Sequence, residues 1–160
     1  MYEMYEQLAR EAVELVMPAI SELLGKYAKR KQLHIVVMDP GMKPWEGSFL
    51  KAVLYERSVG EPGKWEKDYR RIARSKAKQA WRDSQANIIT QMLAPATLES
   101  GDSVFWGSFE YYVVIVAASG IEPWFDMLVS AWVATALQQL AQHKVQQFKT
   151  EHPDADSLPT

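Results

Sequence analysis

The sequence predicts an α+β fold in which helices flank an antiparallel β-sheet, as a layered sandwich. Segments with helical and strand periodicity follow one another in the order ααββαββα. The two strands of each pair are close together in the chain, so tight hairpins are expected. The 160 residues suffice for one domain with a sizeable core. We expect that domain over residues 1–150, and a flexible polar tail with two prolines over 151–160.

The first half of the chain predicts a helix and a hairpin. Residues 2–29 place apolar side chains at helical spacing, and Pro18 should split or kink that helix because it removes a backbone hydrogen bond. Residues 33–38 form an apolar run that predicts a buried strand, and a strong turn signal follows at 39–41. Residues 47–56, apolar on both faces, predict the second strand, paired with the first around a connection at 40–46.

The second half predicts a long helix, a second strand pair and a closing helix. Glycine and proline interrupt the chain at 59–63, and helical spacing then runs from Lys64 to about Met92, before Pro95. Strands are expected over 103–109 and 111–118. The closing helix is expected from Pro123 to about Lys149.

Composition argues against several classes of protein. The net charge of −2 and the pI near 5.9 disfavour a nucleic-acid-binding protein. The longest apolar run is too short to span a bilayer, and the acidic, amphipathic beginning of the sequence does not resemble a secretory signal. The chain contains no cysteine, so disulfides and thiolate metal sites are excluded. We therefore expect a cytoplasmic protein without membrane association.

Two local features suggest an anion site. A β-branched run ends at Ser119-Gly120, and Pro123 then begins a helix, so a small-residue turn lies at the positive end of a helix dipole. The long helix around residue 74 is basic, and its charges are either a solvated face, a small anion site or, less favourably, a nucleic-acid surface. In the anion-site reading, Arg74 or Lys78 meets the ligand near that turn.

Four segments between Leu33 and Leu137 resemble the GlcG/HbpS-like family, which includes the haem-binding C-terminal domain of PduO. They are 36–41, the helix 72–80, the strand region 104–111 and the turn and helix start 118–127. The residues that stand at the family's positions are Ala73, Lys76, Ala77, Ala80, Gly107, Ser119, Gly120 and Asp126. This resemblance implies a homo-oligomer that binds a small anionic or planar ligand, haem or a related tetrapyrrole.

The chain departs from that family where its ligand pocket would lie. The glycine-rich strand of the family keeps only Gly107 here. Bulky aromatic side chains surround this region, namely Trp106, Phe109, Trp124 and Phe125. The predicted binding site consists of Arg74, Lys76 and the Ser119-Gly120 amides for the anionic groups, with Gly107 beside them and Trp106 as a stacking wall.

No catalytic or metal-binding group is predicted. Ser119 has no histidine in a recognisable relation to it, and Asp126 is interpreted as a structural carboxylate at the start of a helix. None of the histidines, His34, His143 and His152, lies in a family motif, so no haem ligand is assigned. A non-enzymatic binder is the first interpretation. The alternatives are an oligomeric scaffold whose pocket is filled by aromatics and, from the resemblance alone, a haem-degrading enzyme.

The closing helix predicts self-association. It carries two adjacent apolar stripes, formed by Trp124, Leu128 and Trp132 and by Phe125, Val129, Val133 and Ala136. A helix that is apolar over so wide an arc is usually buried on two sides.

Overall fold

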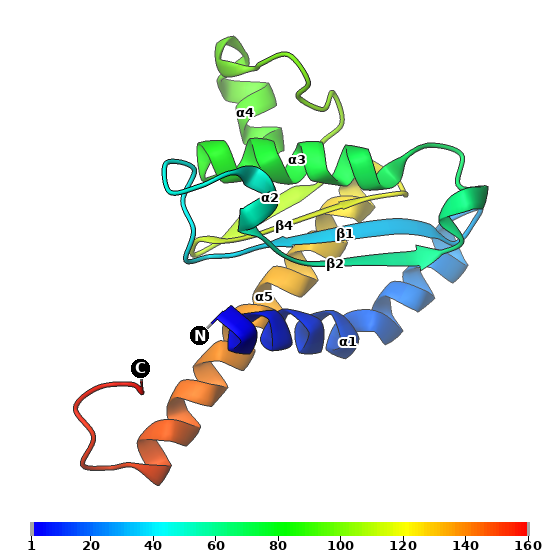
Figure 1. Cartoon of the computed structure of the whole chain (residues 1–160). Helices are drawn as coiled ribbons and strands as arrows, with labels where there is room; N and C mark the ends of the chain where they lie inside the picture. The colour runs from blue at the N-terminus through cyan, green and yellow to red at the C-terminus, as the bar shows by residue number, and fades with distance from the viewer. Residues whose placement is uncertain (1, 160) are drawn as a thin grey trace.

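The α+β class is confirmed by the computed structural model, which describes residues 2–159 (Figure 1). Four antiparallel strands form one sheet in the order β2-β1-β4-β3. The main elements are α1 (Tyr2–Tyr27), β1 (Gln32–Met38), α2 (Phe49–Ala52), β2 (Val53–Gly60), α3 (Tyr69–Asp83), α4 (Asn87–Leu93), β3 (Ser108–Tyr111), β4 (Val114–Ser119) and α5 (Pro123–Glu151).

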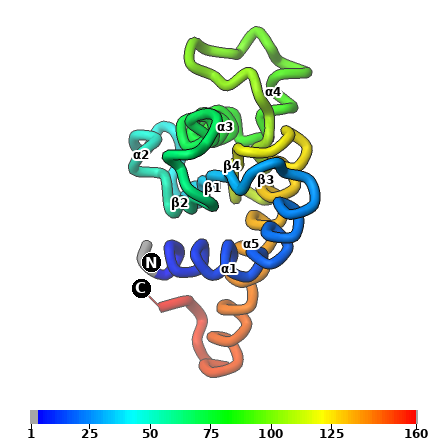
Figure 2. Tube along the Cα trace, turned by 90° about the vertical axis from the view of Figure 1, so that its right-hand side faces the viewer, coloured from blue at the N-terminus to red at the C-terminus, as the bar shows by residue number. Residues whose placement is uncertain are grey.

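The two faces of the sheet carry different helices. Helices α1 and α5 pack on one face and α3 packs on the other (Figures 1 and 2). Strand alternation sorts the core accordingly, because Ile35 and Val37 of β1 join the cluster under α1 and α5. Val36 and Met38 join the smaller cluster under α3. Strands β1 and β4 are buried along their whole length, as expected for central strands covered on both faces.

The second strand of the first hairpin lies later in the chain than predicted. A short helix, α2, occupies part of the predicted strand 47–56, and β2 runs from Val53 to Gly60, into the interruption expected at 59–63. Ser48 caps this helix, since its hydroxyl accepts a hydrogen bond from the Lys51 N–H at 3.5 Å. Helix α1 is continuous through Pro18 and bends about halfway along its length in Figure 1, so the predicted split was wrong and the predicted kink agrees with the structure.

The expected single helix over 64–92 was wrong, because the chain forms two helices there. Asp68 caps the beginning of α3, accepting from the Arg71 N–H at 3.1 Å. Ser84 adopts a left-handed conformation with φ 52° and ends α3. Asn87 then anchors α4, because its fully buried side-chain oxygen accepts from the N–H groups of Gly107 and Ser108, at 3.2 Å each.

The second strand pair begins later than predicted. Residues 103–107 are irregular, and β3 and β4 meet in a tight turn at Tyr112 and Val113, both with positive φ. Helix α5 continues well beyond the sheet to Glu151, and an irregular exposed segment follows over 152–159 (Figure 1).

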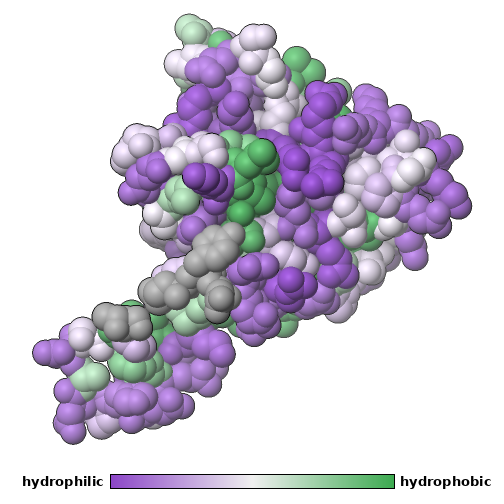
Figure 3. Space-filling model, viewed as in Figure 1, coloured by the Kyte–Doolittle hydropathy of each residue, from purple (hydrophilic) through white to green (hydrophobic). Residues whose placement is uncertain are grey.

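The surface shown in Figure 3 is mostly hydrophilic, with apolar residues gathered in a narrow patch near its centre. Of the helices in the described chain, none combines the length and the apolar character needed to cross a membrane.

Candidate functional site

Four of the six predicted site residues lie in the protein interior, where β4 passes into α5. Lys76 is completely buried, and its Nζ lies 3.0 Å from Asp126 Oδ2 and 3.0 Å from the Ala118 carbonyl oxygen. Gly107 lies directly against this pair, because a Cβ there would come within 2.9 Å of the Lys76 ammonium. The glycine therefore makes room for the ion pair that joins α3, β4 and α5.

The Ser119-Gly120 turn is occupied by contacts within the protein. Gly120 allows β1 to approach closely, since a Cβ at this position would lie 2.0 Å from the Gln32 carbonyl oxygen. Asp126 Oδ1 accepts from the Ile121 N–H at 3.0 Å, in agreement with its interpretation as a structural carboxylate. Its second oxygen binds Lys76, a partner that local sequence does not reveal.

Burial dominates the titration of this pair. Burial raises the pKa of Asp126, an effect that the nearby Lys76 opposes. Burial also lowers the pKa of Lys76, and Asp126 opposes that shift. Each charge thus opposes the effect of burial on its partner, and the hydrogen bond between Nζ and Oδ2 joins the two groups. The Lys76 ammonium thus has two of its three donors engaged inside the fold.

Arg74 and Trp106 do not complete the predicted site. Arg74 faces β2, where its Nε and one terminal nitrogen lie 2.8 and 2.7 Å from the two oxygens of Glu56. Trp106 precedes Gly107 and is partly buried. The structure thus places Lys76, Gly107, Ser119 and Gly120 together, and it directs Arg74 to a separate cluster.

That separate cluster consists of Ser58, His34, Glu56 and Arg74, and sequence reasoning missed it. His34 is buried at 3% exposure, with Nδ1 2.8 Å from Ser58 Oγ and Nε2 2.9 Å from Glu56 Oε1. His34 and Ser58 are direct cross-strand partners, and Glu56 lies two residues along β2 on the same face. Only the β1–β2 register brings these side chains together, so the available signal was the alternation of His34, Glu56 and Ser58 on paired strands.

Glu56 is held as a carboxylate. Burial would raise the pKa of Glu56, but hydrogen bonds from Arg74 and His34, together with their charges, outweigh it and lower the pKa from 4.5 to about 2. The Glu56 side chain is 19% exposed, so this ion pair is well protected from solvent.

Two surface hollows flank the N-terminal end of α3. The first, the α3 hollow, has a volume of about 480 Å³ and lies between that end and the segment 101–105; its lining residues are Lys67, Asp68, Arg71, Ile72, Ser75, Gly101, Asp102, Ser103, Val104 and Phe105. The second, the Ser58 hollow, has a volume of about 410 Å³ and is lined by Ser58, Pro62, Trp65, Glu66, Lys67, Asp68 and Arg70. Both volumes lie in the range of small-molecule sites.

The charges of the α3 hollow are unevenly engaged. Asp102 is bound by both terminal nitrogens of Arg82, at 3.0 and 2.9 Å, and Asp68 accepts from the Arg71 N–H as a helix cap. Lys67 and Arg71 form no ion pair among residues 2–159. The Lys67 ammonium lies 5.0 Å from the centre of the Phe105 ring. Free cations therefore lie beside an aromatic face.

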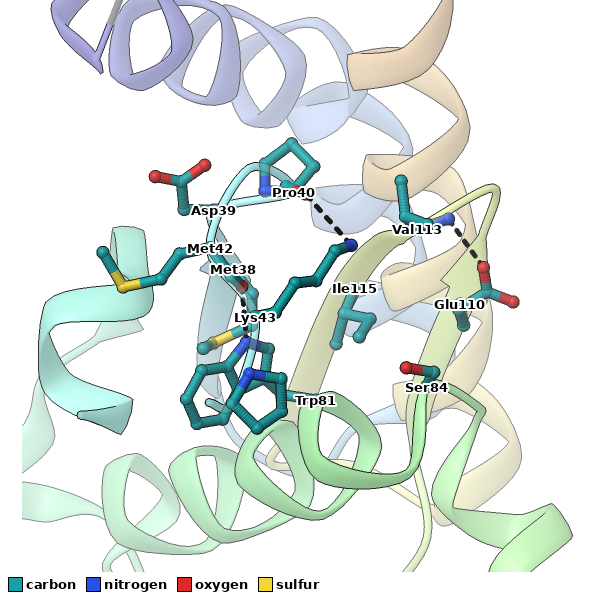
Figure 4. A pocket seen from close by; sticks show the side chains of 11 residues that line it. Met38, Asp39, Pro40, Met42, Lys43, Trp81, Ser84, Glu110, Val113 and Ile115 are labelled. Atoms are coloured by element: carbon teal, nitrogen blue, oxygen red, sulfur yellow. Dashed lines mark hydrogen bonds between the residues drawn. The ribbon is translucent and has the colours of Figure 1, made fainter. Parts of the chain in front are cut away.

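A third, enclosed cavity is too small for a ligand. It lies between the β1–α2 connection and the end of α3, where the Trp81 indole N–H donates to the Met42 carbonyl at 2.8 Å (Figure 4). Its volume of about 20 Å³ is room for a single water molecule.

The histidines provide no haem ligand at these hollows. His34 is bound to Ser58 and Glu56, while His152 stacks on Phe148 with ring centres 4.5 Å apart. His143 lies exposed on α5. No histidine, methionine, tyrosine or cysteine lines the α3 hollow, and of the side chains that ligate haem iron only a lysine, Lys67, is present there. Within residues 2–159, no group of three or more His, Cys, Asp or Glu side chains is arranged to hold a metal ion.

Comparison with known proteins gave no match to a family model, to a curated protein or to a solved structure. The resemblance to the GlcG/HbpS-like family therefore stays a prediction from the residues that carry it.

Proposed function

We propose that the protein binds, without transforming it, a small ligand that combines an anionic group with a planar part, and that the ligand occupies the α3 hollow. The observation that carries this proposal is that two cations without an ion-pair partner, Lys67 and Arg71, line the same hollow as Phe105. The Lys67 ammonium lies over the Phe105 ring, and Phe105 is 41% exposed, so a planar ligand can reach the part of the ring that Lys67 leaves uncovered.

The proposal moves the binding site by about one helical turn from the residues expected in the sequence. Arg74 and Lys76 are each neutralised by a carboxylate, so neither offers a free charge to a ligand. Arg71 precedes Arg74 by three residues on α3 and keeps its charge free. An anionic group at Arg71 and Lys67 would form charge-assisted hydrogen bonds, and Phe105 takes the stacking role expected of its neighbour Trp106.

A tetrapyrrole remains one ligand of this class. Because the proposal uses Lys67 as a cation for the anionic group, its amine is not available to bind iron, and a porphyrin would be held by its propionates and by stacking. Haemin and metal-free protoporphyrin IX should therefore bind with similar affinity. A cytoplasmic setting, expected from the cysteine-free composition, belongs to the same proposal.

The experiment is a titration of the purified protein with protoporphyrin IX and with haemin, followed by absorbance and by quenching of tryptophan fluorescence. We expect saturable binding that weakens at least tenfold in the double variant Lys67→Gln/Arg71→Gln. Lys78→Gln is the matched control, because Lys78 is exposed on the same helix outside the hollow. Absence of saturable binding, or equal affinity in the double variant, would refute the proposal.

A second function, self-association as a scaffold, is favoured by one stripe of α5. Val129 and Val133 are buried within the chain, and Phe125 stacks on Tyr27 with ring centres 4.9 Å apart. Of the other stripe, Trp132 packs partly against the core, while Trp124 and Leu128 remain outside at 55% and 36% exposure. A second copy of the chain is the partner that we propose for this stripe.

Sedimentation velocity tests the self-association. We expect an oligomer that dissociates in Trp124→Ser/Leu128→Ser and persists in Leu15→Ser, which changes an exposed apolar residue of α1. A wild-type protein that stays monomeric at all concentrations would refute it. Haem degradation, the third interpretation, rests on the resemblance alone. It predicts that the Soret absorbance band of added haemin disappears when a reductant is present.

A further inference from the structure

The cross-strand cluster of β1 and β2 has the connectivity of a nucleophile, a base and an orienting carboxylate. Ser58 Oγ lies 2.8 Å from one ring nitrogen of His34, and Glu56 lies 2.9 Å from the other. Both distances are those of hydrogen bonds. A nucleophilic site requires this arrangement, because the base must contact the nucleophile and a third group must orient the base. The two ring nitrogens are exchanged relative to the chymotrypsin arrangement, in which Nε2 faces the serine, but either nitrogen can act as the base.

The proton positions follow from the state of Glu56. With its pKa lowered to about 2, Glu56 is a carboxylate at neutral pH and can only accept hydrogen bonds. Nε2 of His34 must therefore carry a hydrogen that it donates to Glu56. When the imidazole is neutral, Nδ1 has a free lone pair, and the Ser58 hydroxyl donates to it. This is the tautomer that a general base requires.

Solvent and substrate can reach the nucleophile, whereas the base is buried. Ser58 is exposed and lines the Ser58 hollow, whereas His34 is 3% exposed. The Trp65 ring packs edge-on to His34, with ring centres 6.3 Å apart, and also lines the hollow. Arg70 lines the same hollow, with its guanidinium 4.0 Å from Glu56 and its side chain 58% exposed. A cation thus lies beside the space in front of the serine.

We propose that Ser58 is the nucleophile of an esterase site that cleaves small carboxylic esters bound in the Ser58 hollow. Ser58 Oγ attacks the ester carbonyl carbon while its proton passes to His34 Nδ1, and Arg70 stabilises the oxyanion that forms. The intermediate collapses by breaking the bond to the alcohol, which takes the proton from His34 and leaves an acyl-Ser58. Water then adds to the acyl carbon, gives its proton to His34, and releases the carboxylic acid as the proton returns to Ser58.

Glu56 and Arg74 are positioning residues in this site. Glu56 fixes the orientation and tautomer of His34, and Arg74 keeps Glu56 ionised and in place. The two hollows share Lys67 and Asp68, but Arg71 and Phe105 line only the α3 hollow, whereas Ser58 and Arg70 line only the Ser58 hollow. Substitutions at these unshared residues therefore test the two activities separately.

The first test is labelling with a fluorophosphonate, followed by peptide mass spectrometry. We expect one adduct, on Ser58, in which the Oγ–phosphorus bond replaces the phosphorus–fluorine bond. Ser58→Ala should lose the adduct, and the matched control Ser100→Ala, at an exposed serine of the 94–106 segment, should keep it. Since Ser58 is exposed, its substitution should leave the fold intact, which circular dichroism verifies. An unlabelled Ser58, or equal labelling of Ser58→Ala, overturns the proposal.

The second test is the hydrolysis of p-nitrophenyl acetate. We expect kcat to fall at least a hundredfold in Ser58→Ala and at least tenfold in Glu56→Gln, with KM little changed. Glu56→Asp, which keeps a carboxylate charge beside His34, should recover part of the lost kcat. A purely structural role for Glu56 would give Glu56→Gln and Glu56→Asp the same kcat per folded molecule. Turnover that persists in Ser58→Ala contradicts the assignment.

Discussion

Replacement of Lys76 by methionine should destabilise the fold more than any change at the surface. Lys76 and Asp126 are both almost fully buried and lie 3.0 Å apart. Methionine fills a similar volume, so the main effect is to leave Asp126 in the interior without its partner. Breaking a buried pair on one side costs about 3–5 kcal/mol. The mirror change, Asp126→Asn, leaves the Lys76 charge unpaired and should cost a similar amount.

The double variant Lys76→Met/Asp126→Asn separates the contribution of the ion pair to stability from that of side-chain packing. Asparagine keeps an oxygen for the Ile121 N–H, and no charge remains in the interior. The chief loss is the donor of the Ala118 carbonyl, a cost of about 1–2 kcal/mol. The double variant should therefore be more stable than either single variant. The coupling energy, the sum of the two single losses less the loss in the double variant, should be about 4–9 kcal/mol.

Urea unfolding at pH 7, followed by circular dichroism and tryptophan fluorescence, measures these differences. The free energy of unfolding should fall by about 2 kcal/mol for each mole per litre of urea, so each single change should lower the urea concentration at the unfolding midpoint by about 2 M. Additive losses in the double variant would refute the reasoning, because they would mean that the two groups do not stabilise each other. A loss below about 1 kcal/mol in Lys76→Met would refute it as well.

Two further predictions concern acid stability and the glycine turn. The pKa of Glu56 is lowered from 4.5 to about 2, so its ion pair stabilises the fold by about 3 kcal/mol above pH 4.5, and this stabilisation is lost as the pH falls towards 2. Arg74→Gln should therefore raise the pH at the midpoint of acid unfolding. A midpoint that Arg74→Gln leaves unchanged between pH 5 and 2 would speak against the ion pair. Gly120→Ala should destabilise the protein by more than 2 kcal/mol in urea, since the new Cβ meets the Gln32 carbonyl at 2.0 Å. Gly25→Ala, where a Cβ meets nothing within 4 Å in α1, should instead stabilise it by up to about 1 kcal/mol, and the same sign for both changes would contradict this account.

Local sequence determined the order and type of the larger elements. The apolar run of β4 and the small residues at Ser119-Gly120 predicted a strand, a turn and a helix, and the structure has all three. Such patterns are readable because side-chain periodicity depends only on the backbone of the segment itself. The predicted element boundaries that were wrong are those that helix caps and distant contacts decide. At Ser48 the short helix α2 replaces part of a predicted strand, and at Ser84 α3 ends where a longer helix was predicted.

The chemistry of the candidate sites was decided by tertiary structure. The sequence identified Lys76 and Asp126 as residues of interest, yet their pairing across 50 positions follows only from the tertiary arrangement that brings α3 to the end of β4, where α5 begins. Arg74 likewise has its charge engaged by Glu56, and the free cations are Arg71 in the first turn of α3 and Lys67 just before it.

The histidine cluster shows the same division. His34 and Ser58 are ordinary residues of two strands, 24 positions apart, and only the register of β1 against β2 makes them direct neighbours. A shift of one residue would place Ser58 on the opposite face of the sheet, away from His34. The sequence by itself determined which segments are strands and helices, because that information is local. The three-dimensional fold decided which charges are neutralised and which hydroxyl meets a base, because those contacts join segments that are distant in the chain.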